Sequence, residues 1–260
     1  MGFPTNEDEF RAFLSGDHPS LRRDRALLRW LPSDPRCKTC NAPFGMPGVV
    51  VSRAIGRPRW GKSPKFCQHC ARFLTMTGIM GAEIEISILF ADVRGSTELA
   101  ERVGAVEFGR LIDRYYKVAS RALIEADGIV DKFIGDGVLG LFIPAMSGLD
   151  HSARAVAAAR QILAATGHPG QPWLPVGAGV HRGIAFVGAI GEAGVLQDFT
   201  ALGDAVNAAA RLGSLAGTGE VLVSLPAATA AGIDGSAGVR RTLDLRGRSE
   251  PMDAVVLRAA

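Results

Sequence analysis

The chain has 260 residues, of which 47% are hydrophobic and 21% are charged, the composition of a soluble globular protein. Its first ten residues, MGFPTNEDEF, lack the basic and apolar parts of a signal peptide, and no apolar run reaches the ~18 residues of a membrane span. We therefore expect a cytoplasmic protein that has no membrane partner.

The net charge of +3 is unevenly distributed along the chain. Residues 1–81 hold 13 Lys and Arg residues against 6 Asp and Glu residues, whereas residues 82–260 hold 16 against 20. All four cysteines also lie in the first part. We therefore predict two domains: a small basic module over residues 1–81 and a mildly acidic domain over residues 82–260.

The module begins with apolar residues at helical spacing, which predict one or two short helices over residues 6–31. Pro32 and Pro35 end this region. Residues 71–81 are expected to form a helix or a linker that leads into the second domain. The helices are interpreted as a lid that packs on a neighbouring element.

Two CxxC pairs follow the predicted helices, Cys37 with Cys40 and Cys67 with Cys70, and 26 residues separate them. Each short turn aims two thiolates at one point, which is the arrangement of a tetrahedral zinc site in a zinc-ribbon-like module. A Cys₄ iron–sulfur cluster is the alternative, and reversibly oxidised thiols are a further one. A metal would supply folding energy that the Gly- and Pro-rich segment between the pairs lacks.

The segment between the cysteine pairs also carries basic and aromatic side chains. A basic loop with aromatics beside a metal site can bind nucleic acid, but we favour a solvated loop or an internal docking surface. The residues concerned are Arg53, Arg57, Arg59, Trp60, Lys62, Lys65 and Phe66.

From residue 83 the pattern becomes α/β. The expected strands cover residues 84–93, 129–134, 138–143, 174–181, 184–190, a short strand ending at Thr200, 220–224, 240–245 and 254–257. The expected helices cover residues 96–126, 150–166, a stretch from 205 onward and 226–231. Two hairpins are predicted, one through Gly135-Asp136-Gly137 and one about His181-Arg182-Gly183.

Two aspartates, Asp92 and Asp136, each stand at the end of a β-branched apolar run. Strands that are neighbours would place both carboxylates at one edge of a sheet, where they suit Mg²⁺ or Mn²⁺. This arrangement indicates a two-metal site for phosphoryl transfer.

Polar groups that could complete such a site follow in the sequence. Gly95, Ser96 and Thr97 open a helix just past Asp92, and the free N–H groups of its first turn can receive a triphosphate, with Ser96 or Thr97 as the N-cap. Asn207 and Arg211 are four residues apart and therefore share one helix face.

Together these residues resemble the class III adenylyl/guanylyl cyclase catalytic domain. The similarity covers about residues 84–258, through FADVRGST, DKFIGDG, GVHRGIAFVGAIG, DFTALGDAVNAAARL and LRGRSEPMDAVVL, in the family's order. It implies an α/β (α+β) fold with a ferredoxin-like βαββαβ core. It also implies a head-to-tail homodimer with active sites at the subunit interface.

The resemblance also implies a role for each matched residue. Asp92 and Asp136 match the metal ligands, and Lys132 and Thr200 match the two positions that read the purine. The remaining matches are Asn207 and Arg211, which orient the ribose and stabilise the transition state, and Arg246, which stands where many relatives place a triphosphate-binding lysine.

The residues favour ATP as the substrate and 3′,5′-cyclic AMP as the product. Lys132 can donate to an adenine ring nitrogen, and the Thr200 hydroxyl can accept from the exocyclic amine. Guanine reverses this pattern, and nothing acidic stands at either position. Guanylate cyclase activity is the alternative within the enzyme class. A nucleotide-sensing module whose basic Cys₄ segment binds nucleic acid or a protein partner is the alternative outside it.

Overall fold

The computed structural model describes residues 6–61, 64–75, 81–192, 196–233, 238–244 and 251–258. The chain divides into two compact units, which we describe separately. The first comprises Met1–Ile84, Ile143–Gly148 and Ile184–Leu202, and the second comprises Glu85–Phe142, Leu149–Gly183 and Gly203–Ala260.

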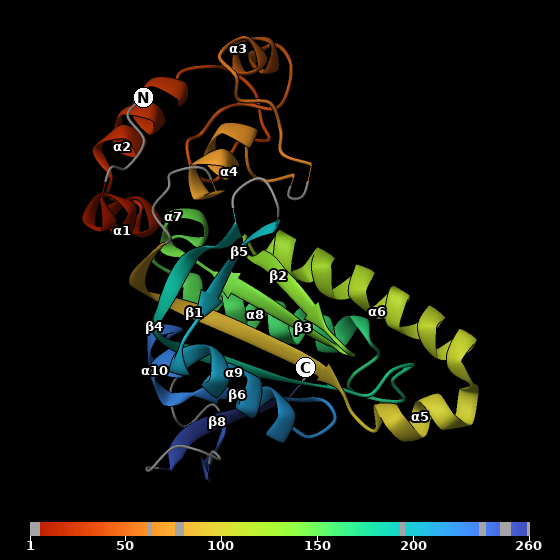
Figure 1. The fold of residues 1–260 in the computed structure, drawn as a ribbon. Helices are drawn as coiled ribbons and strands as arrows, with labels where there is room; N and C mark the ends of the chain where they lie inside the picture. The colour runs from red at the N-terminus through yellow and green to blue at the C-terminus, as the bar shows by residue number, and fades with distance from the viewer. Residues whose placement is uncertain are drawn as a thin grey trace. The chain divides into compact units, whose positions relative to one another are not determined.

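Short helices make up much of the first unit (Figure 1). The two helices predicted over residues 6–31 are confirmed as α1 (Glu7–Ser15) and α2 (Pro19–Leu28). The Asn6 side chain caps α1 by accepting from the backbone N–H of Glu9 at 2.9 Å. Helix α1 buries Phe10, Phe13 and Leu14 and packs against α7 (Pro144–Ser147). The other helices are α3 (Gly48–Ala54), which the sequence did not predict, and α4 (Gln68–Thr75), in the region expected to be a helix or linker.

A mixed sheet forms the frame of the second unit, in the order β2-β3-β1-β4-β6-β8-β7 (Figure 1). The later part of β4 belongs to the first unit, where it pairs with β5 (Leu196–Leu202) off this path. Its strands are β1 (Gly81–Val93), β2 (Ile129–Ile134), β3 (Gly137–Phe142), β4 (Val176–Glu192), β6 (Glu220–Ser224), β7 (Val239–Leu243) and β8 (Met252–Arg258). Strand β4 runs parallel to β6, whereas β1 with β3, β2 with β3 and β6 with β8 are antiparallel. The α+β fold class is confirmed.

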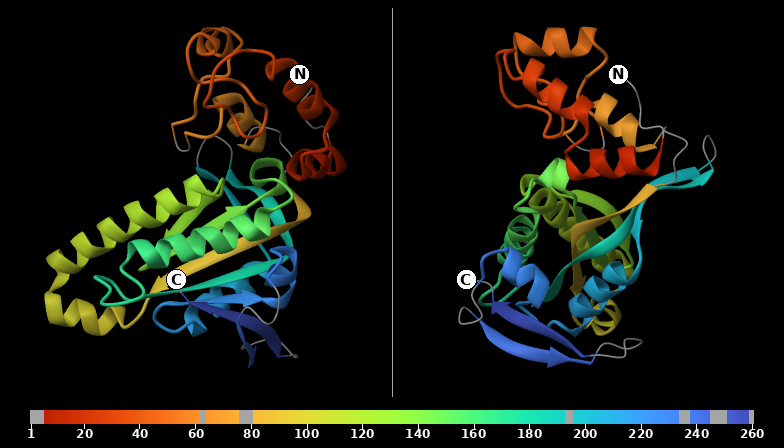
Figure 2. Two further views of the ribbon diagram at one scale, coloured as in Figure 1. Left: turned by 180° about the vertical axis from the view of Figure 1, so that it is seen from behind. Right: turned by 90° about the vertical axis from the view of Figure 1, so that its left-hand side faces the viewer.

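Alternating residues of the central strands bury the two faces of this sheet against different helices. Val221 and Val223 of β6 join the core formed with α6 (Ala105–Glu125), α8 (His151–Ala165) and α10 (Leu225–Ala230). Leu222, which points to the opposite face, packs with Leu212 of α9 (Asp204–Leu215). Figure 2 shows α6 and α8 together on one side of the sheet. Helix α9 therefore occupies the other face.

The hairpin predicted about His181-Arg182-Gly183 is wrong. Strand β4 continues through these residues because its first part pairs with β6 and its later part pairs with β5. His181 is a core residue of the strand, with its Nδ1 atom 2.9 Å from the Ser224 hydroxyl.

The single helix predicted over residues 96–126 is also divided. Helix α5 (Ser96–Val103) ends at Gly104, and α6 starts directly after it. Gly104 has a φ of 81°, which glycine adopts without the steric penalty of a side chain. The chain therefore changes direction between two helices that share one apolar periodicity.

Candidate functional site

The register of the sheet brings Asp92 and Asp136 to one edge. Asp92, next to the last residue of β1, lies opposite Gly137 of β3. Ile134 of β2 also pairs with Gly137, so Gly135 and Asp136 form the turn of the predicted β2–β3 hairpin. Gly135 has a φ of 61°, which a tight turn of this kind favours. Asp136 therefore lies directly beside the strand position that faces Asp92.

The surroundings of Asp92 favour a bound cation. Partial burial and the neighbouring Asp136 carboxylate raise the pKa of Asp92, and Arg94 opposes the shift. The Asp92 Oδ1 atom accepts from the backbone N–H of Val93 at 3.0 Å, and its Oδ2 atom accepts from the Arg94 guanidinium at 2.8 Å. Two neighbouring carboxylates at a sheet edge supply the oxygen ligands that a hard divalent ion prefers. The residues present fit such an ion.

Tyr115 belongs to the same neighbourhood, although no sequence pattern distinguished it from other core residues of α6. It is fully buried, and its hydroxyl has no hydrogen-bond partner within the described part of the chain. Burial raises the pKa of Tyr115 well above its ordinary value, and the charges of Asp92 and Asp136 act in the same direction. A buried hydroxyl in the field of two carboxylates is a natural partner for a water molecule of a hydrated cation.

The helix start after Asp92 differs in detail from the prediction. Gly95, with a φ of 62°, is the N-cap of α5, and no side chain caps the helix. Ser96 and Thr97 are therefore the first two helical residues, and the expectation that one of them is the N-cap is wrong. The left-handed conformation of Gly95 lets the helix begin directly after β1.

Asn207 and Arg211 lie on α9, one turn apart as predicted. Asn207 is exposed and Arg211 is half-buried. Neither side chain forms a hydrogen bond or an ion pair with another residue in the ranges that the structure describes. Both polar groups are therefore available to a ligand or a second chain.

The remaining predicted residues have different surroundings. Lys132 lies in β2, with its Nζ atom 3.7 Å from the Oδ2 atom of the buried Asp131 side chain. Thr200 is buried in the interior of β5, opposite Gly188, so the prediction that it ends a strand is wrong. The reason is that the pairing of β5 with β4 continues to Leu202. Arg246 lies outside the described residues.

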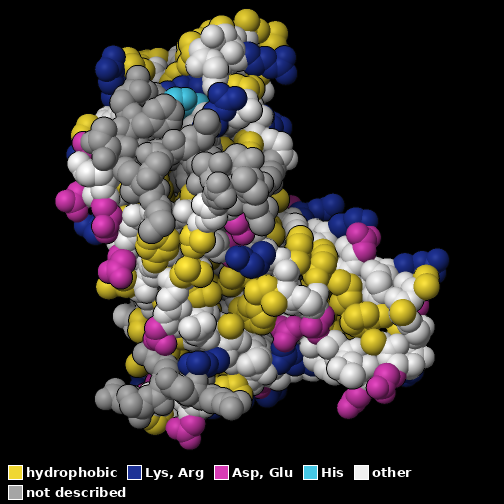
Figure 3. Space-filling model, in the orientation of Figure 1, with side chains coloured by type: hydrophobic (Ala, Val, Ile, Leu, Met, Phe, Trp, Pro, Cys, Tyr) yellow, Lys and Arg dark blue, Asp and Glu magenta, His cyan; other side chains and the backbone are white. Residues whose placement is uncertain are grey.

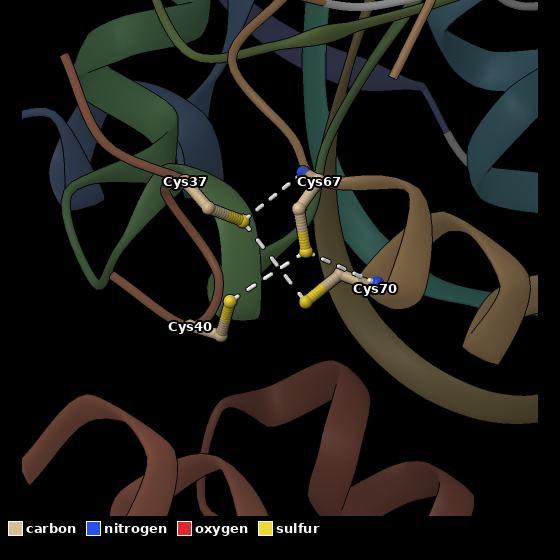
Figure 4. A group of neighbouring side chains, drawn as sticks. All are labelled: Cys37, Cys40, Cys67 and Cys70. Atoms are coloured by element: carbon tan, nitrogen blue, oxygen red, sulfur yellow. Dashed lines mark hydrogen bonds between the residues drawn. The ribbon is translucent and has the colours of Figure 1, made fainter. Parts of the chain in front are cut away.

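The four cysteines form one buried cluster in the first unit. Their sulfur atoms all lie within 4.8 Å of one another, and Figure 4 shows the side chains converging from two separate segments. The sulfurs of Cys37 and Cys70 are 4.0 Å apart, and those of Cys40 and Cys67 are 3.6 Å apart. A tetrahedral ion with metal–sulfur bonds of about 2.3 Å places its ligands about 3.8 Å apart. The cluster therefore has the dimensions of a Cys₄ metal site.

The contacts around the sulfurs favour thiolate ligands. The backbone N–H of Cys67 donates to the sulfur of Cys37 at 3.3 Å, and that of Cys70 donates to the sulfur of Cys67 at 3.4 Å. Burial opposes ionisation of Cys37, but hydrogen bonds from the other three cysteines lower its pKa well below the ordinary value. Arg57 and Asp24 form a buried ion pair at 2.7 Å in the same unit.

Comparison with known proteins identifies the class that this fold and site define. The family model of the adenylate and guanylate cyclase catalytic domain matches residues 80–256. The chain therefore belongs to this family. Cyclase domains of this class bind a nucleoside triphosphate, use divalent metal ions and often work as dimers.

Individual relatives include both adenylyl and guanylyl cyclases. An adenylate cyclase of Anabaena cylindrica is 35% identical over 138 residues, which are 50% of this chain and 27% of that protein. The structure of the guanylyl cyclase Cya2 is 29% identical, with a TM-score of 0.62 over 70% of this chain and 95% of the other. The adenylyl cyclase CyaB from P. aeruginosa is 26% identical, with a TM-score of 0.57 over 68% and 96%.

The chain matches only about a quarter of the length of the first curated relatives, with 27% for the Anabaena enzyme and 25% for an uncharacterized protein of Mycobacterium tuberculosis. None of the helices that the structure describes combines the length and the apolar character needed to cross a membrane.

Proposed function

We propose that this chain is an adenylate cyclase that converts ATP to 3′,5′-cyclic AMP and pyrophosphate at the interface of a homodimer. The observation that carries the proposal is the meeting of Asp92 and Asp136 at one sheet edge, where partial burial and the Asp136 carboxylate raise the pKa of Asp92. Membership of the cyclase family supports the reaction class.

Cyclisation requires the ribose 3′-oxygen to attack the α-phosphorus in line while pyrophosphate leaves. Two Mg²⁺ or Mn²⁺ ions held by the aspartates would lower the pKa of the 3′-hydroxyl and neutralise the triphosphate. The backbone N–H groups of Ser96 and Thr97, in the first turn of α5, are proposed to bind the triphosphate, and Arg246 is proposed as a further contact to it.

The other half of the site is proposed to come from the partner subunit. Asn207 orients the ribose, and Arg211 stabilises charge that develops on the α-phosphate oxygens. Because α9 packs on the sheet through Leu212 and through Ala216 directly after its last residue, it is a rigid support for a fixed cation. Removal of such a group costs about 10²–10³ in rate. A homodimer would contain two complete sites of this kind.

Lys132 and Thr200 are proposed to select adenine. The lysine donates to a ring nitrogen, and the threonine hydroxyl accepts from the exocyclic amine. Guanine, which offers the reverse pattern, would need an acidic group at one of these positions. Guanylate cyclase activity is the second candidate, because one similar structure is that of a guanylyl cyclase.

The Cys₄ cluster is proposed to hold Zn²⁺, with an iron–sulfur cluster as the alternative, in a module over residues 1–81. Within the first unit, the Arg25 side chain donates to the carbonyl of Thr39, between Cys37 and Cys40, at 2.8 Å and to the carbonyl of Ala145 in α7 at 3.0 Å. Helix α7 directly follows β3. The module immediately precedes the strand that carries Asp92 in the sequence, so ordering of the metal site is proposed to bias how two subunits align.

Two alternative roles concern the basic character of this module. Lys and Arg side chains are scattered over the surface of this module in Figure 3, and the alternative partners for its basic segment are nucleic acid and another protein. Salt-sensitive DNA binding by the full chain, together with the absence of turnover, would favour that role over catalysis. If chelation of the metal leaves both turnover and dimerisation unchanged, the proposed influence on the cyclase domain is wrong.

The test of the proposed function is an assay of Asp92→Ala and Asp136→Ala with ATP and Mn²⁺. Both substitutions should abolish cyclic AMP formation while the chain stays folded. Asp113→Ala is the matched control, because Asp113 lies on the exposed face of α6 and pairs with Lys117. Undiminished turnover by either site variant would refute the metal assignment.

A further inference from the structure

Arg94 connects the end of β1 to the end of α9. Its guanidinium donates to the Asp92 carboxylate at 2.8 Å and to the backbone carbonyl of Ser214 at 2.6 Å, with a longer bond to that of Ala216 at 3.4 Å. Its own backbone N–H donates to the carbonyl of Pro175 at 2.8 Å. One side chain thus joins a proposed metal ligand to the helix that carries Arg211.

The chemistry of both attachments suits a guanidinium. The carbonyls at the end of a helix lack intrahelical partners and carry the negative end of the helix dipole, so they favour a cation. The carboxylate adds a charge-assisted bond, which is shorter and stronger than a neutral one. Arg94 is mostly buried, with 19% of its side chain exposed, so solvent screens these contacts only partly.

The last turn of α9 also packs closely against β1 near Arg94. Gly213, in the last turn of α9, lies directly against Phe90 of β1. A Cβ atom at position 213 would lie 2.6 Å from the Phe90 ring and 2.9 Å from its carbonyl oxygen. The end of α9 and the strand that presents Asp92 therefore pack directly against each other, and Arg94 adds hydrogen bonds between them.

Asp92 can keep this contact while it binds a metal. Each carboxylate oxygen has two acceptor positions, and each oxygen of Asp92 uses one of them, for Val93 and Arg94 respectively. One position on each oxygen stays available to a cation. Arg94 therefore orients the carboxylate without having to leave.

We propose that Arg94 is a positioning residue for both half-sites of one chain, and that it couples the two active sites of the dimer. The inference rests on the proposed function, in which Asp92 serves one active site while Arg211 of the same chain serves the other. The Arg94 guanidinium, which holds Asp92 against α9, then positions the metal ligand of one active site and the transition-state-stabilising Arg211 of the other.

Mixed dimers separate these two effects. In a mixture of Arg211→Ala chains with Asp136→Ala chains, neither homodimer has a complete site, and the heterodimer has one. Arg94→Gln on the Arg211→Ala chain then affects only the metal half of that site. The same substitution on the Asp136→Ala chain affects only the α9 half. The reference is the mixture with Arg94 intact in both chains.

We expect both placements to impair the heterodimer in different ways. In the metal half, Arg94→Gln should raise the Mn²⁺ concentration for half-maximal rate about five- to tenfold. In the α9 half, it should lower kcat about tenfold while the Mn²⁺ dependence stays constant. Arg94→Lys should recover part of the metal effect only, because an ammonium group cannot span the carboxylate and both carbonyls.

Arg110→Gln is the matched control, since Arg110 is an exposed arginine paired with Glu107, and it should change neither value. An effect of Arg94→Gln confined to one placement, or shared by the control, would overturn the coupling. If the reference mixture regains no activity, the homodimer is wrong. Amide hydrogen exchange then decides the structural claim: Arg94→Gln must speed exchange in the last turn of α9, and unchanged exchange would refute it.

Discussion

Gly179→Ala is the substitution that most directly tests how the sheet positions α9. Gly179 lies in β4, and its position faces the last turns of α9. An added Cβ atom would lie 2.2 Å from the backbone nitrogen of Gly213 and 2.6 Å from the carbonyl carbon of Leu212. Ordinary contacts between such atoms need about 3.5 Å, so the helix must move by roughly 1 Å.

The magnitude of the effect follows from this displacement. Overpacking of a core costs about 1–3 kcal/mol, and a clash with backbone atoms that cannot rotate away belongs at the upper end of that range. A loss of about 3 kcal/mol corresponds to a melting temperature lower by about 6–12 °C for a domain of this size. A 1 Å shift of Arg211 should also lower turnover about 10²-fold.

The assay compares Gly179→Ala with Gly109→Ala by thermal unfolding and by cyclic AMP formation. Gly109 is the fifth residue of α6, and an added Cβ atom there meets nothing within 4 Å. Alanine there should stabilise the chain by about 0.5–1 kcal/mol and leave turnover unchanged. If Gly179→Ala matches the wild-type chain in both measurements, α9 does not pack on β4 as described.

Three further predictions concern the two candidate metal sites. Because the pKa of Asp92 is raised in the folded state, ionisation of this carboxylate destabilises the metal-free chain, and the free energy of unfolding falls as pH rises from the ordinary pKa of 3.8 through the raised pKa. Asp92→Asn should therefore become more stable than wild type across this pH window and stay more stable at neutral pH, as measured by urea unfolding. Tyr115→Phe should stabilise the metal-free chain by about 1 kcal/mol and raise the Mn²⁺ concentration that activity requires. Tyr116→Phe is the contrast, because it removes a hydrogen bond to the carbonyl of Gly135 and should destabilise the chain. A loss of stability in Tyr115→Phe would show that the Tyr115 hydroxyl already has a hydrogen-bond partner. Elemental analysis should find one Zn²⁺ per chain, absent in Cys40→Ser, which should also melt at a lower temperature; equal metal content in both would exclude the cluster as the binding site.

Local patterns in the sequence were sufficient to predict the structure where one or two residues determine the local geometry. The strand that ends near Asp92 and the hairpin at Gly135 and Asp136 were predicted because apolar runs bounded by glycine leave few alternatives. The cysteine pairs were predicted for a similar reason: two CxxC turns can converge on one point, and their sulfurs do converge.

Features that depend on partners distant in sequence could not be read in the same way. The residues around His181 contain a glycine and a basic side chain typical of turns, yet two different neighbouring strands keep β4 extended. Arg94 and Tyr115 belong to the site only because β1, α6 and the end of α9 meet in space. No periodicity or spacing in the sequence distinguishes these two residues from an ordinary surface arginine and an ordinary core tyrosine.

The central claim is that this chain cyclises ATP. The most direct measurement incubates the purified full chain with ATP or GTP, each with Mg²⁺ or Mn²⁺, and identifies the product by mass. We predict 3′,5′-cyclic AMP and pyrophosphate in a metal-dependent reaction, with ATP turned over faster than GTP. Faster turnover of GTP would overturn the assignment of Lys132 and Thr200, and no cyclic nucleotide from either substrate with either metal would contradict the account as a whole.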